Sequence, residues 1–199
     1  MKTDPQILSS VQHHMEESLR DLEFAIFERT PPDEAAVFWV PLEFLQHFYP
    51  LEGEYCYFCL EYFDCCAKCP YGAVHGVCNE RGSDWQKLSG VGLALEDVMS
   101  NPVPWSSFEY ILNKTKLQDI EDTVRSCLGR LWAHVKELGK CETVEEWMQK
   151  KQELLLLWAD VIEEIMGEVA QYRVSRVLKV FRWAVKRYYY RGERYDAER

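Results

Sequence analysis

Apolar residues recur at three- and four-residue steps along three long stretches of the chain, and each stretch predicts an amphipathic helix. The first covers residues 5–28 and the second covers residues 115–138, where the spacing is most regular. This second stretch places Cys127 in the core and not in a ligand site. The third stretch covers residues 143–190, and we interpret it as one long helix because the apolar register continues past Gly167.

Proline and glycine divide the remaining chain into shorter segments. Residues 41–48 predict a short helix with Pro41 in its first turn, and residues 93–100 predict a single helical turn. A lone Gly-x-Gly at residues 90–92 has no strand before it, so we interpret it as a loop and not as a phosphate-binding motif. The pattern predicts one mostly α domain over residues 1–199, an antiparallel helical bundle.

Six of the eight cysteines fall within the 24 residues from Tyr55 to Cys78. They include two Cys-x-x-Cys pairs, and two residues between thiols let the chain turn back so that both sulfurs reach one metal. The N–H groups of such a turn point at the sulfurs and stabilise their charge. The candidate metal ligands are Cys56, Cys59, Cys66, Cys69 and Cys78, with Cys65 and His75 as additional candidates.

Four thiolates suit either zinc or a [4Fe–4S] cluster. The six residues between the two pairs are few for a zinc ribbon or finger, and Cys69-Pro70 resembles ferredoxin segments in which a ligand cysteine precedes proline. Disulfides and buried free thiols are the alternatives, although residues 1–10 lack the apolar region of a secretory signal peptide. We expect residues 50–85 to form a small cysteine-rich metal-binding lobe at one end of the bundle.

The order C-x2-C, a short gap, C-x2-C-P and a further cysteine at position 78 resembles a motif of small uncharacterised proteins of phages, bacteria and archaea. The resemblance covers about 24 of the 199 residues, and the doubled Cys65-Cys66 departs from the motif. It implies metal binding by the cysteines and carries no activity with it.

Charge is distributed unevenly along the chain. The net charge is −10, yet residues 171–199 hold nine Lys/Arg against three acids, which leaves −16 for the rest. Basic residues interleaved with aromatic ones favour contact with nucleic acid or with an acidic protein, and the alternative is that they complement the helix dipole and pair with the acidic body. The candidate contacts are Arg176, Lys179, Arg182, Lys186, Arg187, Tyr189 and Arg191.

These patterns predict a non-enzymatic binding or regulatory protein whose zinc or iron–sulfur centre is structural. The alternative is an iron–sulfur redox or electron-transfer protein, or a thiol-based redox sensor. His75 and Asp84 are candidate acid–base groups, but the sequence supplies no third group to orient them. No apolar run approaches the roughly eighteen residues of a membrane span, so we expect a soluble, cytoplasmic protein; its aromatic content leaves oligomerisation open.

Overall fold

The computed structural model describes residues 1–29, 36–63, 65–100, 116–167 and 174–195. Within these residues the fold is mostly α, and no strand forms apart from an isolated bridge between Lys2 and Thr143. The long helices are α1 (Pro5–Glu28), α2 (Ala36–His47), α5 (Asp84–Ser100), α7 (Leu117–Leu138), α8 (Val144–Met166) and α9 (Val174–Ala184). A π-helical turn, Val185–Tyr189, continues α9. No helix in the described ranges is long and apolar enough to cross a bilayer.

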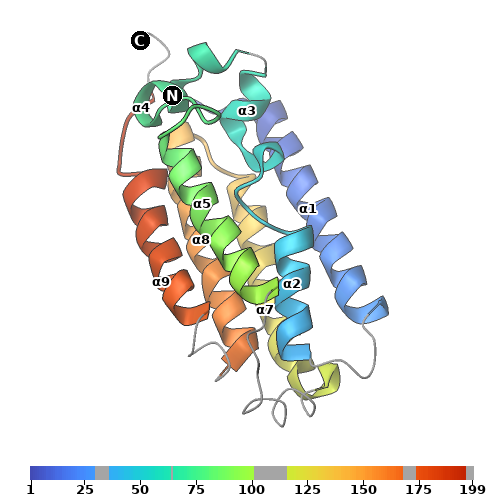
Figure 1. Ribbon diagram of the computed structural model, residues 1–199. Coiled ribbons are helices and arrows are strands. Elements are labelled where there is room, and N and C mark those ends of the chain that lie inside the picture. The colour runs from blue at the N-terminus through green and yellow to red at the C-terminus, as the bar shows by residue number, and fades with distance from the viewer. Residues whose placement is uncertain (30–35, 64, 101–115, 168–173, 196–199) are drawn as a thin grey trace.

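The long helices pack side by side, and consecutive ones run in opposite directions (Figure 1). Helix α7 lies against both α1 and α8, while α9 lies against α5 and α8. The antiparallel bundle expected from the sequence is therefore present. The cysteine-rich segment lies at one end of this bundle, where Figure 1 also places both chain termini.

The cysteine-rich segment shares the core of the bundle. It contains the short helices η1 (Gly53–Tyr55), α3 (Tyr57–Glu61), η2 (Cys66–Lys68) and α4 (Pro70–His75). Its aromatic side chains Tyr55, Tyr57, Phe58 and Tyr71 are buried in the same apolar cluster as the long helices. Tyr57 accepts a hydrogen bond from the Asp4 N–H at 2.8 Å, and Tyr55 donates one to Ser18 at 2.6 Å. The segment is thus fastened to α1 by aromatic residues and has no separate core.

Two of the predicted helices agree with the structure. Helix α1 has the predicted bounds, and Asp4 caps it by accepting the N–H of Gln6. Helix α7 begins within two residues of the predicted start and ends at Leu138, and Cys127 is fully buried on its inner face. Strict apolar periodicity predicted both elements because one face of each helix packs on the bundle core.

The prediction of one long helix over residues 143–190 is wrong. Helix α8 ends at Met166, and Gly167 follows with φ +53°, a backbone conformation that glycine adopts readily and other residues rarely do. Residues 168–173 lie outside the described ranges, and α9 then packs alongside α8. The apolar register continues past Gly167 because both helices face the same core.

Two shorter predictions are also wrong. Helix α2 begins at Ala36, so Pro41 lies inside the helix and not in its first turn. Residues 90–92, interpreted as a loop, lie in the middle of α5. A Cβ on Gly92 would lie 1.8 Å from the hydroxyl oxygen of Tyr49, whose ring packs on Trp158 at 5.2 Å. Gly92 therefore permits close approach of Tyr49 to α5, whereas Gly90 faces open space.

We expect opposite effects from alanine at these two glycines of α5. Gly92→Ala should lower the free energy of unfolding by about 1–3 kcal/mol, because its methyl group overlaps the packed Tyr49 side chain. Gly90→Ala should raise it by about 0.5–1 kcal/mol, because alanine restricts the unfolded chain and meets no atom within 4 Å. Urea unfolding measures both, and equal shifts of the two variants would contradict this packing.

Candidate metal centre

The two Cys-x-x-Cys segments place their first and last cysteines at the starts of short helices. Cys56 precedes α3 and receives hydrogen bonds from the N–H groups of Phe58 and Cys59. Cys69 precedes α4 and receives them from Tyr71 and Gly72. In both cases the donors lie two and three residues after the sulfur, as expected for a turn that stabilises thiolate charge.

Four half-buried thiols lie close enough to influence one another: Cys56, Cys59, Cys69 and Cys78. The hydrogen bond from Cys59 lowers the pKa of Cys56 to about 7 and raises that of Cys59. Burial raises the pKa of Cys78 to about 12, and it also raises the pKa of Cys69. One thiol of the group is therefore set up to ionise first, and its negative charge opposes ionisation of the others.

The remaining candidate cysteines lie nearer the surface. Cys65 and Cys66 are exposed, although Cys66 influences Cys69 and Cys78 electrostatically. Cys127 and Cys141 are buried elsewhere in the bundle, and all eight cysteines are free thiols. The structure therefore separates the six clustered cysteines into an inner group of four and an outer adjacent pair.

The thiols line two adjoining cavities. An open cavity of about 570 Å³ is bounded by Cys59, Cys66, Cys69 and Cys78 together with apolar side chains such as Phe58 and Val77. A smaller cavity of about 90 Å³ lies toward the bundle core and is bounded by Cys56, Cys59, Cys78, Tyr71 and Lys151. Cys59 and Cys78 line both spaces, so they lie between the surface and the core.

Lys151 places a buried ammonium group beside this inner cavity. Its Nζ donates to the carbonyl oxygen of Tyr55 at 3.0 Å and lies 5.2 Å from the centre of the Tyr55 ring. Burial lowers the pKa of Lys151 to about 7, against the opposing attraction of Cys56 and Glu52. Tyr71 lines the same cavity, and its hydroxyl group is buried with no hydrogen-bond partner among the described residues.

A metal site is not already formed by these side chains. Among the described residues, no group of three His, Cys, Asp or Glu side chains could hold a metal ion as they lie. The donor chemistry nevertheless fits a metal–thiolate centre, because such a centre is anionic and accepts hydrogen bonds at sulfur. It would provide a counter-charge for Lys151 and an acceptor for Tyr71, and both are otherwise poorly compensated.

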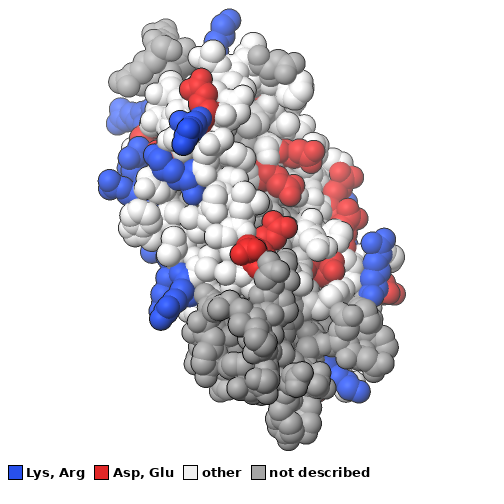
Figure 2. All heavy atoms as spheres, viewed as in Figure 1, with Lys and Arg blue, Asp and Glu red and all other residues white. Residues whose placement is uncertain are grey.

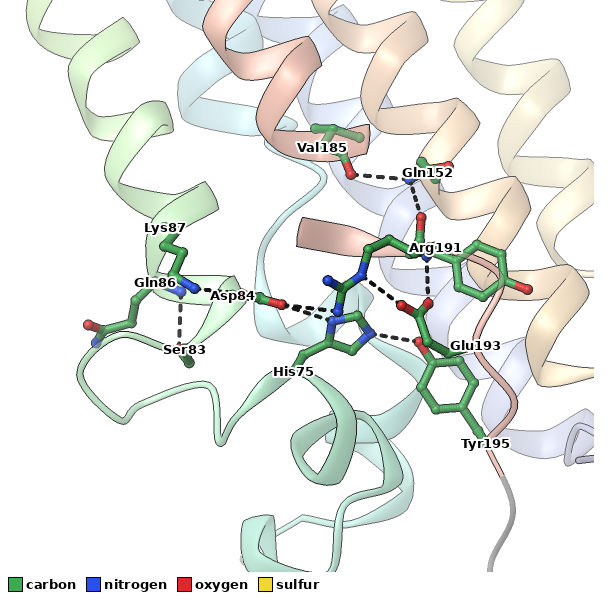
Figure 3. Close-up of polar contacts among 11 residues, drawn as sticks. His75, Ser83, Asp84, Gln86, Lys87, Gln152, Val185, Arg191, Glu193 and Tyr195 are labelled. Carbon is green, nitrogen blue, oxygen red and sulfur yellow. Dashed lines mark hydrogen bonds and ion pairs between the residues drawn. The ribbon is translucent and has the colours of Figure 1, made fainter. Parts of the chain in front are cut away.

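His75, the last residue of α4, has a buried ring with a partner at each nitrogen (Figure 3). Its Nδ1 lies 3.3 Å from a carboxylate oxygen of Asp84, and its Nε2 lies 3.1 Å from the hydroxyl of Tyr195. The ring stacks on Tyr71 with 4.3 Å between centroids. In this arrangement His75 joins α4 to α5 and to the C-terminal segment, and neither nitrogen is available to a metal.

The C-terminal segment is held by further polar contacts that Figure 3 shows together. Gln152 of α8 donates to the carbonyl oxygens of Val185 and Tyr190 at 3.1 and 2.8 Å. Arg191 forms salt bridges with Glu193 at 2.8 Å and with Asp84 at 3.8 Å. These contacts hold residues 190–193 against α8 and the start of α5.

The predicted basic contacts fall into two groups. Arg182 turns toward α8 and forms salt bridges with Asp160 at 2.6 Å and Glu163 at 2.7 Å, while Arg191 pairs as described above. Tyr189 is buried in the core, so its ring is not available for stacking on a partner. The other four side chains are exposed: Arg176, Lys179, Lys186 and Arg187.

Sequence reasoning did not identify Lys151, Tyr71 and Tyr195 as parts of this site. A signal for Lys151 was present, because it lies on the apolar stripe of α8 between Trp147 and Leu154. A lysine in that register must either be buried or distort the packing. No comparable signal identified Tyr195, which reaches His75 across 120 residues of sequence.

No protein-family model, curated protein or solved structure matches the chain. The resemblance to the prokaryotic and phage cysteine motif therefore stays a prediction.

We expect His75 to make the folded protein sensitive to acid. Burial lowers its pKa below the ordinary value of about 6.5, despite the hydrogen bond to Asp84. As the pH falls below about 6.5, the unfolded chain takes up a proton that the folded ring resists, so the free energy of unfolding decreases. The limiting slope for one proton is about 1.4 kcal/mol per pH unit.

Urea unfolding between about pH 7 and pH 5 measures this slope. His75→Gln should flatten it, whereas His13→Gln, on the exposed face of α1, should keep the wild-type slope. Because the comparison concerns slopes, a constant loss of stability in the His75 variant does not affect it. The same slope in all three proteins would contradict a pH-sensitive role for His75.

Proposed function

We propose that this chain is a metal-binding helical protein in which Cys56, Cys59, Cys69 and Cys78 hold a metal–thiolate centre. We further propose that it acts as a non-enzymatic binding or regulatory module. The observation that carries the metal proposal is the gathering of Cys56, Cys59 and Cys78 around the cavity that also receives a buried lysine, with Cys69 lining the adjoining cavity. A cytoplasmic location would suit it, because thiols stay reduced there.

Charge compensation supports an anionic centre at this position. A buried ammonium without a counter-charge is costly, and within the described part of the chain the Tyr55 carbonyl accepts one of its three N–H groups. The backbone N–H groups directed at Cys56 and Cys69 add further positive potential. A metal bound by several thiolates carries net negative charge, so it fits between these donors.

The arrangement of the thiols favours a [4Fe–4S] cluster over zinc. A single zinc ion binds thiolates at about 2.3 Å in a tetrahedron, which requires sulfurs within about 4 Å of one another. The four thiols here line two adjoining cavities, and no group of three described donors is placed to hold a single ion. In a cluster each thiolate binds a different iron, so the four sulfurs stand further apart.

A thiol-based redox function is the second candidate, and the Cys56–Cys59 pair is the observation that favours it. A hydrogen bond from its neighbour lowers the pKa of Cys56 to about 7, a combination that activates the first thiol of a Cys-x-x-Cys pair for disulfide exchange. Metal analysis separates the two candidates, because this second function needs no metal.

Protein purified without oxygen should contain iron and inorganic sulfide in about equal amounts, with broad visible absorbance. Cys56→Ser, Cys59→Ser, Cys69→Ser and Cys78→Ser should each lose most of the iron, whereas Cys65→Ser and Cys127→Ser should retain it. If wild-type protein instead contains about one zinc per chain and the same four variants lose it, the bound metal is zinc and the proposed ligands are unchanged. Absence of any metal in wild-type protein would refute the metal centre and favour the redox pair.

Lys151→Met tests whether Lys151 serves as the counter-ion of a metal–thiolate centre or has only a structural role. Removal of the buried charge should weaken metal retention by about ten-fold or more, measured by competition with a chelator. The metal-free variant should be at least as stable as metal-free wild type, because an apolar chain replaces a poorly compensated ammonium. Lys150→Met, the adjacent lysine that pairs with Glu153 at the surface, is the matched control. Unchanged retention in the Lys151 variant would contradict the counter-ion role.

A further inference from the structure

The outward side of α9 is a narrow basic and aromatic strip, which we call the α9 face. It consists of Arg176, Lys179, Val180, Trp183, Lys186 and Arg187, and all six residues are exposed. At about 100° per residue the four positions within α9, Arg176 to Trp183, fall within an arc of about 100°, and Lys186 and Arg187 follow in the π-helical turn. Along the axis they extend about 16 Å, from Arg176 to Arg187.

The cations of the α9 face are available to a partner. In the described part of the chain, none of Arg176, Lys179, Lys186 and Arg187 forms a salt bridge, although Lys179 is near enough to Glu163 to lower the pKa of that carboxyl group. Asp160 and Glu163 of α8 form their salt bridges with Arg182.

Trp183 lies at the centre of the α9 face with 57% of its surface exposed. It contacts Tyr188 edge to face with 5.5 Å between centroids, and Lys87 of α5 covers the Tyr188 ring at 4.8 Å. These contacts support one side of the indole while the rest faces solvent. A large aromatic ring held in the open between cations is a suitable platform for a flat π-system.

Charge distribution restricts the shape of the partner. Figure 2 shows Lys and Arg gathered over the edge of the molecule where α9 lies, with Asp and Glu gathered across the rest of this face, over the region of α5, α2 and α1. A flat anionic membrane or a wide duplex that reached α9 would also approach these acids. A narrow, flexible polyanion can follow the α9 face alone.

We propose that the α9 face binds single-stranded nucleic acid, with the cations on phosphates and an unpaired base stacked on Trp183. Cations alone would serve an acidic peptide, but the exposed indole at the centre of the strip matches an unpaired base. The inference rests on the binding-module part of the proposed function, and its residues are separate from the proposed metal ligands.

Fluorescence anisotropy of a labelled oligothymidylate of about twelve nucleotides tests the proposal on the full chain. Wild-type protein should bind at low salt, and the logarithm of the association constant should fall with log salt at a slope of about −3, since each of four cations contributes about −0.7. Lys179→Glu and Lys186→Glu should weaken binding and make the slope shallower. Lys136→Glu, an exposed lysine of α7, should change neither.

Substitutions of Trp183 test stacking. Trp183→Ala should weaken binding about ten-fold and Trp183→Phe less, with unchanged helical circular dichroism. Phe24→Ala removes an aromatic residue of similar exposure, 51%, from α1 and should have no effect. Equal losses in the Trp183 and Phe24 variants would overturn the proposal.

Three other probes complete the test: a duplex of the same length, polyglutamate, and vesicles containing phosphatidylserine. Weaker binding of all three than of the single strand is expected. Equal or tighter binding of any one would overturn single-strand recognition in favour of that partner. Metal content is measured on every sample, so failure to bind the oligonucleotide with normal metal content refutes this inference and leaves the metal centre standing.

Discussion

Lys151 brings an amino group into the core of the bundle, where burial lowers its pKa to about 7 and its protonated form needs support from the residues around it. Within the described residues its Nζ donates a hydrogen bond to the carbonyl oxygen of Tyr55, at the end of the short helix η1. The rings of Tyr55 and Trp147 lie 5.2 and 6.0 Å away, where their π faces attract the cation. Full desolvation of an ammonium costs several kcal/mol, so these contacts and the thiol of Cys56 together decide how the cysteine-rich end packs.

The same end of the molecule is closed by residues from distant parts of the sequence. Tyr57 accepts the N–H of Asp4, His75 contacts Tyr195, and Gln152 holds the chain where it leaves the π-helical turn. Short helices such as α3 and α4 are not stable alone in water. Their stability depends on buried aromatic rings shared with α1 and α8, and this explains why the segment forms no independent lobe.

Periodicity predicted the helices whose inner faces are uniformly apolar, and it was wrong where backbone chemistry decided the outcome. Gly167 ends α8 through its positive φ, whereas Gly92 lies inside α5 and its missing Cβ leaves room for Tyr49. Glycine in a sequence does not distinguish these two causes. The N–H groups that point at Cys56 follow from the Cys-x-x-Cys spacing, whereas those that point at Cys69 come from the start of α4, beyond its motif. Lys151 and Tyr195 join them only through tertiary packing, which local sequence does not specify.

The cysteine-rich end and α9 are joined by a continuous set of contacts. Tyr71 stacks on His75, His75 pairs with Asp84 at the start of α5, and α5 packs along α9. Arg191, just beyond the π-helical turn, also reaches Asp84. A metal held by Cys69 and Cys78 would fix both ends of α4 and, through these contacts, the end of α9. A structural metal is therefore consistent with a binding surface on α9: it would hold in place the short helices on which the C-terminal segment rests.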